Sequence, residues 1–260
     1  LGREGAAFRA LTRPEFDVTD AERIARCVVP GVGTVIHCAA FTDVAGAESR
    51  EEEASRVNGF GVGLLACRCA EVGATLVHFS TDYVFDGRAD RPYPIDHPRA
   101  PINAYGRGKA LGEELIAEAG GRFLLIRTSW LYAPWGKNLV LAMHARLSRG
   151  ETPRVVDDQV GRPTSAEYLA LRTLALLGSN VPGVFHVTDG GQCSWFEFAS
   201  RIAMRSTPPA RVVSCKSTEF PTPRRPAYSV LDLTRTEALL GPLRGWEANL
   251  DDVLGALAVR

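Results

Sequence analysis

The sequence lacks an excess of charge of either sign, since Lys plus Arg and Asp plus Glu each number 30 in 260 residues. This balance provides no overall field that attracts nucleic acid, a membrane or a polyanion, so we expect no nucleic-acid and no membrane partner. No apolar run reaches the roughly 18 residues of a membrane helix, and no leader with a cleavage site is visible. We therefore expect the protein in the cytoplasm.

Paired metal ligands and redox motifs are also missing. The six cysteines include no CxxC pair and several lie in apolar runs, which is typical of small buried thiols in a reducing compartment. The five histidines show no ligand spacing, so we expect packing or surface positions for them and no metal site. With 45% hydrophobic residues, the chain can fold around a sizeable core without metals or disulfides.

The first 150 residues alternate short apolar strands with helices of ten or more residues. Strands are expected at 34–40, 75–80 and 123–128, and helices at 50–72, 104–119 and 137–148. This alternation predicts an α/β fold with a doubly wound parallel, Rossmann-type sheet covered on both faces. Such sheets bind ligands at the carboxyl ends of their strands, so we seek the chemistry just after Ala39, Ser80 and Thr128.

Past about residue 150 the regular alternation of strands and helices ends. We expect an extended segment at 154–158, a helix at 166–177, a strand near 184–187, a proline-rich stretch at 208–226 and a terminal helix at 249–259. The prolines around Pro221, Pro223 and Pro226 favour a stiff loop over a recognition motif. We predict a dinucleotide-binding domain at 1–150 and a smaller, mixed substrate lobe at 151–260, with segments returning to the main sheet.

Tyr105 and Lys109 lie four residues apart on the helix expected at 104–119, so their side chains project from one face. An ammonium there is expected to lower the pKa of the phenol, which would then exchange a proton with a substrate oxygen near neutral pH. Taken alone, Tyr-x-x-x-Lys is a weak signal because amphipathic helices often carry it by chance.

The segment Ser80-Thr-Asp-Tyr-Val-Phe-Asp-Gly stands at the carboxyl end of the preceding strand. Its hydroxyls and carboxylate fit residues that cap a turn, and they also fit groups that reach a ligand from the sheet edge. A hydroxyl there, followed by Tyr-x-x-x-Lys on the next helix, forms an oxyanion-binding and acid pair suited to a carbonyl substrate.

The sequence resembles the extended short-chain dehydrogenases, and within them the dTDP-4-dehydrorhamnose reductases. The resemblance runs from about Phe16 to the C-terminus, and four blocks in this order make it specific. They are Ser80-Thr-Asp-Tyr-Val-Phe-Asp-Gly, Tyr105-Gly-Arg-Gly-Lys-Ala-Leu-Gly-Glu, Arg127-Thr-Ser-Trp-Leu-Tyr and Asp158-Gln-Val-Gly-Arg-Pro-Thr.

The resemblance implies a role for each matching residue. Thr81 would be the catalytic hydroxyl, Tyr105 the proton donor, and Lys109 the residue that tunes the tyrosine and holds the nicotinamide ribose. Asn58 would help to organise the lysine, with a polar residue on a helix face as the alternative. The remaining assignments are Asp17 and Val18 at the adenine, Ala39, Ala40 and Thr42 along the cofactor, and Thr81, Asp82 and Trp130 at the sugar, with Asn138 and Arg225 at the diphosphate. For Arg225, an exposed basic turn at 224–226 is the alternative.

The activity implied is hydride transfer from NADPH, or NADH, to C4 of a 4-keto-6-deoxy sugar on dTDP, giving dTDP-L-rhamnose or a related deoxyhexose. The expected partner is this nucleotide-sugar, and a homodimer is left open. A nucleotide-sugar epimerase or dehydratase is the first alternative. The segments Thr128-Ser-Trp and Asp158-Gln159 favour the reductase over it. A non-catalytic regulatory subunit is the second, and the joint presence of Thr81, Tyr105 and Lys109 speaks against it.

The family's opening strand and glycine-rich turn, which hold a pyrophosphate, are not found in this sequence. The run Ala6–Leu11 after Gly2 and Gly5 resembles the second strand, and Leu1 the tail of the first crossover helix. We favour an incomplete sequence over a lost pyrophosphate site. Arg9 and Arg13 favour NADPH through a 2′-phosphate contact, with solvated surface arginines as the alternative.

Overall fold

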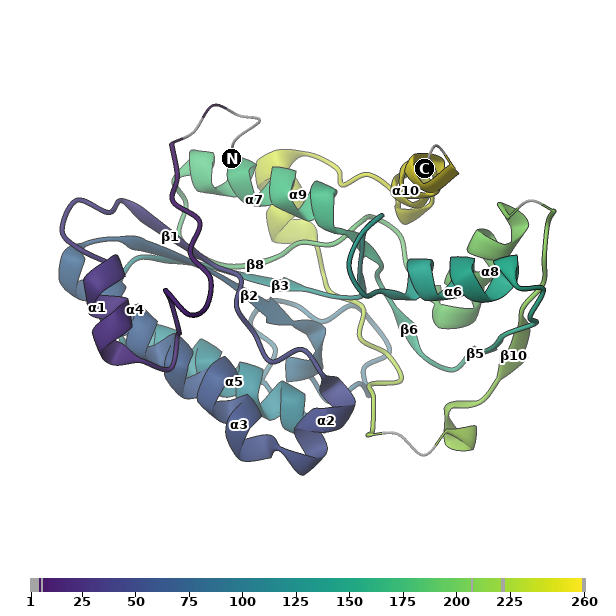
Figure 1. Cartoon of the computed structure of the whole chain (residues 1–260), viewed down its shortest axis with the longest axis horizontal. Helices are drawn as coiled ribbons and strands as arrows, with labels where there is room; N and C mark the ends of the chain where they lie inside the picture. Colours follow the sequence, from purple (N-terminus) through teal and green to yellow (C-terminus); the bar gives the residue numbers. More distant parts are fainter. Residues whose placement is uncertain (1–4, 6, 207, 221–222, 259–260) are drawn as a thin grey trace.

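The fold is built on a four-stranded, all-parallel sheet in the order β1-β2-β3-β8. The structure is a computed structural model that describes residue 5 and residues 7–206, 208–220 and 223–258. The strands are β1 (Thr34–His37), β2 (Thr75–Thr81), β3 (Phe123–Thr128) and β8 (Gly183–His186). Because the four strands run in the same direction, their carboxyl ends meet along one edge of the sheet (Figure 1).

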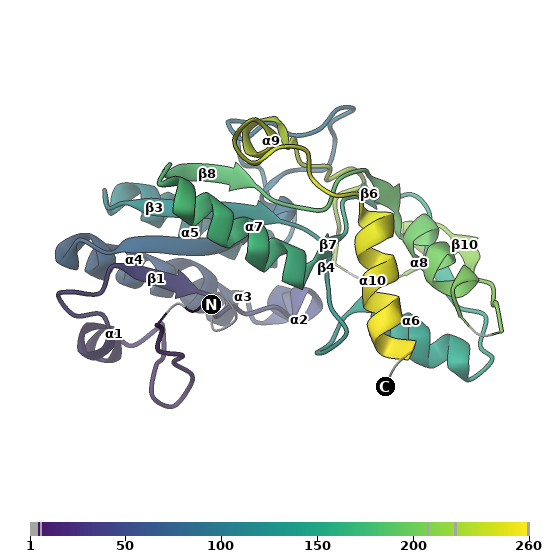
Figure 2. The ribbon, with the colours of Figure 1, turned by 90° about the horizontal axis from the view of Figure 1, so that it is seen from above.

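Helices cover both faces of this sheet (Figures 1 and 2). One face carries α1 (Ala21–Cys27), α4 (Gly61–Val72) and α5 (Ala104–Glu118), and the other carries α7 (Ala166–Ser179) and α9 (Thr234–Leu240). Successive residues of β2 point to opposite faces, so Leu76 packs in the core under α4 and α5 while Val77 packs in the core under α7. The predicted doubly wound α/β sheet is confirmed.

The helix expected at 50–72 is interrupted. The structure has α2 (Val44–Ser49), α3 (Glu51–Ser55), a π-helical turn (Arg56–Phe60) and then α4. A π turn inserts one residue into the helical repeat, which a hydrophobic pattern of period 3.6 does not reveal, and such turns are frequent at functional sites. The residue that this turn carries inward is Asn58.

Three further sequence expectations need correction. Residues 7–11, expected to form a strand, are irregular, and Ala6 lies outside the described residues, as do Leu1, Gly2, Pro221 and Val259. The helix expected from Lys137 begins at Leu139, because Asn138 caps it. The sequence reading also missed α1, α9 and α8 (Trp195–Met204), although α8 opens with the capping box of Ser194 and Glu197.

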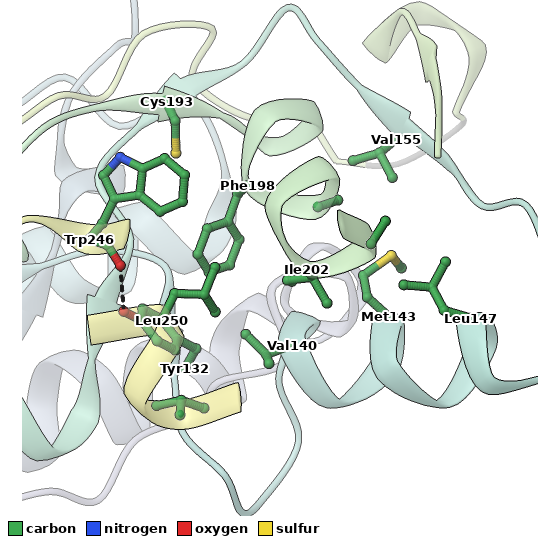
Figure 3. Close-up of a cluster of buried hydrophobic side chains, with 13 residues drawn as sticks. Tyr132, Val140, Met143, Leu147, Val155, Cys193, Phe198, Ile202, Trp246 and Leu250 are labelled. Atoms are coloured by element: carbon green, nitrogen blue, oxygen red, sulfur yellow. Dashed lines mark hydrogen bonds between the residues drawn. The ribbon is translucent and has the colours of Figure 1, made fainter. Parts of the chain in front are cut away.

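The second lobe packs three helices around an aromatic core (Figures 2 and 3). These helices are α6 (Leu139–Ser148), α8 and α10 (Trp246–Ala258). Short strand pairs frame them: β5 (Arg154–Val156) with β10 (Val213–Cys215), β4 (Leu131–Tyr132) with β7 (Thr164–Ser165), and β6 (Val160–Gly161) with β9 (Cys193–Ser194). Tyr132 lies in this core, donates to Asp189 at 2.7 Å, and so links it to the end of the main sheet.

The division at residue 150 stays a prediction. From the second half, β8 belongs to the main sheet and α7 packs on it, while α6 from the first half packs in the lobe core. Across the described ranges no helix has the length and apolar character to cross a membrane. Nor do the described histidine, cysteine and acidic side chains gather into a group of three that could hold a metal ion.

Candidate active site

Thr81 and Tyr105 lie together at the carboxyl end of β2. Thr81 is the last residue of β2, and its hydroxyl donates to Asp82 Oδ1 at 3.0 Å. Asn103 accepts from the backbone N–H of Gly106 at 2.8 Å and so begins α5 at Ala104, which puts Tyr105 in the first turn of the helix. The phenol of Tyr105 is half-buried and within hydrogen-bonding reach of the Thr81 hydroxyl. The structure thus brings the two predicted catalytic groups side by side.

Gly106 explains how α5 can approach this strand end so closely. A Cβ at Gly106 would lie 2.2 Å from the backbone oxygen of Tyr83, where no side chain fits. The ring of Tyr83 meets that of Tyr105 edge-on, with centroids 6.0 Å apart. The glycine in Tyr105-Gly-Arg-Gly-Lys is therefore required by packing between the helix and the strand end.

The electrostatic environment of Tyr105 differs from the sequence prediction. Burial raises the pKa of the phenol well above its usual value, and the nearby Asp82 carboxylate and Tyr83 add to the rise. Hydrogen bonding with the Thr81 hydroxyl opposes the rise. The expectation that the Lys109 ammonium lowers this pKa is wrong in this structure, because that ammonium points elsewhere. Tyr105 is thus a neutral phenol with a proton to donate at neutral pH.

Lys109 is buried beneath the site and turns toward the sheet. Its Nζ donates to the backbone oxygen of Phe79 at 2.6 Å and lies 3.4 Å from His78 Nε2. Burial lowers the pKa of Lys109 to about 8, and the nearby Glu113 carboxylate partly opposes the fall. An ammonium has three hydrogens, and these two partners account for two of them.

Asn58 holds the loop that follows β1. Its Oδ1 accepts from the backbone N–H of Phe41 at 2.9 Å, and its Nδ2 donates to the backbone oxygen of Phe41, also at 2.9 Å. The Phe41 ring packs with Tyr105 around a small core of Ala47, Ala54 and Ala104. The resemblance implied that Asn58 organises Lys109, but its amide instead fixes the wall beside Tyr105. The alternative to that role was a polar residue on a helix face. Asn58 is buried, and the π turn gives it this position.

Glu113 and Arg127 form a buried ion pair between α5 and β3, which the sequence did not predict. Both Glu113 oxygens accept from Arg127, at 2.9 Å from Nε and 2.7 Å from Nη2. Ser80 Oγ donates to Glu113 at 2.5 Å, and Arg99 approaches it at 3.3 Å. Glu113 continues the helical stripe of Tyr105 and Lys109 by one more turn, and that spacing is the signal that could have revealed it. The pair joins α5 to β3 and so fixes the helix that carries Tyr105.

Replacing Glu113 by Gln should therefore destabilise the protein strongly. Arg127 is 3% exposed, and removing its partner leaves a buried, uncompensated guanidinium, for which the expected cost is about 3–5 kcal/mol. Chemical denaturation at pH 7 measures the free energy of unfolding, with Glu114→Gln, an exposed residue on the same helix, as the control. A loss below about 1 kcal/mol for Glu113→Gln would show that the pair does not hold α5 in place.

The residues expected along the cofactor divide into two groups. Ala39, Ala40 and Thr42 follow the carboxyl end of β1 and are exposed or half-buried, so they leave the small-residue surface that the prediction required. Val18, in contrast, is buried in the core under α4, so its side chain cannot contact an adenine. Asp17 accepts from the backbone N–H of Thr19 at 2.9 Å and from its hydroxyl at 2.8 Å, which closes the turn before α1.

Trp130 and Asn138, both expected at the substrate, have different surroundings. Trp130 has a left-handed backbone (φ 48°) and stacks on Trp195, with ring centroids 3.5 Å apart. The amide of Asn138 caps α6, since its Oδ1 accepts from the backbone N–H of Leu141 at 3.2 Å. Its Nδ2 donates to the backbone oxygens of Ala133 and Trp135 at 2.9 and 3.0 Å. The structure therefore gives Asn138 a capping role and no support as a diphosphate partner.

Arg225 is exposed, as the basic-turn alternative expected, yet its loop is tied to the site. Asn103, which caps α5, also donates to the backbone oxygen of Arg224 at 3.0 Å. The charge of Arg225 reaches Tyr83, where it opposes a rise of the phenol pKa to about 12 that burial causes. Arg9 is paired with Glu15, so the structure does not present it as a free phosphate ligand.

Asp82 is a buried carboxyl whose charge destabilises the fold. Burial raises its pKa to about 6 from an ordinary 3.8, while hydrogen bonds from Ser229 and Thr81 oppose the rise. A carboxyl with a raised folded-state pKa retains its proton in the folded protein between pH 4 and 6, so stability falls as pH rises through that window. Asp82→Asn lacks this titration. Its free energy of unfolding relative to the parent protein should thus increase by about 3 kcal/mol between pH 4 and 7.5. Urea denaturation across this range tests the expectation, and a pH-independent difference would contradict it.

Comparisons with known proteins agree with this geometry. Residues 1–259 match the family model described as the RmlD substrate binding domain. A dTDP-4-dehydrorhamnose reductase of Streptomyces griseus is 40% identical over 272 residues, covering 100% of this chain and 89% of the relative. A dTDP-4-keto-6-deoxy-D-glucose reductase of Streptomyces niveus is 40% identical over 252 residues, covering 93% and 85%.

The crystal structure of a dTDP-4-dehydrorhamnose reductase from Bacillus anthracis str. Ames in complex with NADP superposes with a TM-score of 0.92. The two proteins are 33% identical, and the match covers 98% of this chain and 92% of that one. A match over nearly the whole chain, in sequence and in structure, shows the family. The chain belongs to the dTDP-4-dehydrorhamnose reductase family, whose model is the RmlD substrate binding domain.

Proposed function

We propose that this protein catalyses the NAD(P)H-dependent reduction of the C4 ketone of a dTDP-4-keto-6-deoxyhexose, converting dTDP-4-dehydrorhamnose to dTDP-L-rhamnose or forming a related deoxysugar. The observation that carries the proposal is the pairing of Thr81 with Tyr105 at the carboxyl end of β2. The names of the Streptomyces and Bacillus relatives support the substrate class.

Thr81 and Tyr105 would bind the carbonyl oxygen and protonate it. A hydroxyl and a phenol at one point can both donate to an oxygen on which negative charge develops during reduction. The raised pKa of Tyr105 keeps its proton in place until that charge forms, because the phenol is neutral in the resting site. In this proposal Thr81, Tyr105 and Lys109 are the catalytic residues, while Asn58 positions the Phe41 wall beside Tyr105.

The residues present fit a nicotinamide cofactor at the end of β1. Ala39, Ala40 and Thr42 leave room for close approach, and Lys109 keeps one N–H that can hold a ribose hydroxyl. The bound cofactor would supply the hydride. The NADP complex of the Bacillus anthracis relative favours NADPH over NADH. Arg9 is paired with Glu15, so its side chain adds no support for a 2′-phosphate contact.

Oxidation of added NADPH in the presence of a dTDP-4-keto-6-deoxyhexose tests the proposal. We expect one NADPH consumed for each keto-sugar converted, with product formed over many turnovers. Conversion of the sugar with a retained cofactor and no net oxidation would identify the epimerase or dehydratase alternative and reject ours. Binding of NADPH without any turnover would identify the regulatory-subunit alternative. A cytoplasmic location and a homodimer stay predictions.

A further inference from the structure

Gln159 carries a buried side-chain amide to which the proposed mechanism gives no role. The residue is 8% exposed, and within the described part of the chain its amide has no hydrogen-bond partner. The protein nevertheless does not close the amide oxygen and nitrogen off from solvent. Buried polar groups are nearly always hydrogen-bonded, so an unpaired amide that solvent still reaches points to a ligand.

The backbone around Gln159 places this amide beside the two stacked indoles. A Cβ at Gly161 in β6 would lie 2.7 Å from Cε2 of Trp130, so that side of Gly161 faces the indole. Side chains alternate along an extended strand, and Gln159, two positions earlier, is therefore directed to the same side. The backbone oxygen of Gln159 also accepts from the N–H of Trp195 at 3.3 Å, and Trp195 stacks on Trp130.

The same segment is tied to the catalytic end of the sheet. The backbone oxygen of Val160 accepts from the N–H of Ser229 at 2.9 Å, and Ser229 stands next to the Asp82 carboxyl. Asp82 directly follows the catalytic hydroxyl at the end of β2. The chain around Gln159 therefore runs between the catalytic pair on one side and Trp130 on the other, where the sugar is expected.

We propose that the Gln159 amide binds a ring hydroxyl of the deoxyhexose, beside Trp130. An amide offers a donor and an acceptor, which a sugar hydroxyl matches, while an indole packs against the apolar C–H groups of the ring. The thymine imide could pair with an amide in the same way, but the position beside Trp130 favours the sugar. The inference rests on the proposed function, because it takes the nucleotide-sugar and the place of Trp130 from it.

Calorimetric titration of the full chain with dTDP-L-rhamnose and with dTDP tests this contact without turnover. Met has a shape similar to Gln but no hydrogen-bonding group, so Gln159→Met should raise the Kd of dTDP-L-rhamnose about tenfold, the effect of one lost hydrogen bond. The Kd of dTDP should not change. Gln192→Met, at an exposed glutamine, is the matched control and should change neither value. An unchanged Kd for dTDP-L-rhamnose, or equal weakening of both ligands, would overturn the inference.

Steady-state kinetics and denaturation separate sugar binding from a structural role. Gln159→Met should raise KM for the keto-sugar about tenfold and leave kcat and the KM for NADPH unchanged, because the contact is made equally before and during reduction. Urea denaturation should show no loss of stability, since the amide has no protein partner to lose. A fall in kcat alone, or a destabilised protein, would contradict the assignment. If the parent protein binds dTDP-L-rhamnose but reduces no keto-sugar, the proposed function fails, while the titration still decides the role of Gln159.

Discussion

Replacing Tyr105 by Phe should reduce kcat for keto-sugar reduction by about 10²–10⁴-fold, the range that a positioned general acid contributes. The ring and its packing against Phe41 and Tyr83 remain, so KM and the free energy of unfolding should change little. Steady-state kinetics with circular dichroism of the folded protein measures both.

The matched control is Tyr168→Phe, which removes a phenol from α7 on the opposite face of the sheet. Its hydroxyl accepts from the backbone N–H of Arg244 at 2.9 Å, and its loss should leave kcat unchanged. If Tyr105→Phe keeps more than about a tenth of the parent kcat, the proton comes from another group, and the role assigned to Tyr105 is wrong.

Replacing Lys109 by Met should abolish reduction while making the protein more stable at neutral pH. The lowering of the Lys109 pKa from 10.5 to about 8 means that the folded state disfavours the ammonium by about 3 kcal/mol. Because the folded pKa is depressed, the parent protein loses this stability as pH falls from 10.5 to 8, and the loss is complete below 8. Met fills a similar volume without charge, so Lys109→Met should gain stability at pH 7 and lose that advantage toward pH 10.5.

Urea denaturation at pH 7 and pH 10 measures this gain, and turnover with NADPH measures the functional loss. Lys137→Met, at an exposed lysine, is the control and should change neither quantity. A Lys109→Met protein that is less stable at pH 7, or one that retains activity, would contradict the account. The expected result would show that the buried ammonium is kept for its function at the expense of stability.

The elements that position the site were predictable because their signals are local. The strands β2 and β3 and the helix carrying Tyr105 and Lys109 lie where apolar runs and helical spacing predicted them. The strand expected at 34–40 is also present, although it ends at His37. The joint position of Thr81 and Tyr105 followed from one topological rule, that parallel strands end at one edge.

What the sequence did not reveal depends on contacts between distant segments. The pairing of Glu113 with Arg127, the two-way bond of Asn58 to Phe41 and the stacking of His37 on His78 each join residues on different elements. The π turn that directs Asn58 inward likewise has no signature in hydrophobic periodicity.

The direction of the Tyr105 pKa could not be predicted for the same reason. Spacing put Lys109 on the same helical face as Tyr105, but it could not show that the backbone of Phe79 and the ring of His78 draw the ammonium away from the phenol. It also could not show that Asp82 stands buried and close enough to raise the phenol pKa.

The most direct test of the central claim follows the reducing hydrogen itself. The protein is incubated with a dTDP-4-keto-6-deoxyhexose and NADPH that carries deuterium at both hydrogens of nicotinamide C4, and the sugar product is examined by NMR and mass spectrometry. The account predicts one deuterium at C4 of the product sugar and a matching amount of oxidised cofactor. A product without deuterium at C4, or a sugar recovered unreduced in the presence of bound cofactor, would contradict it.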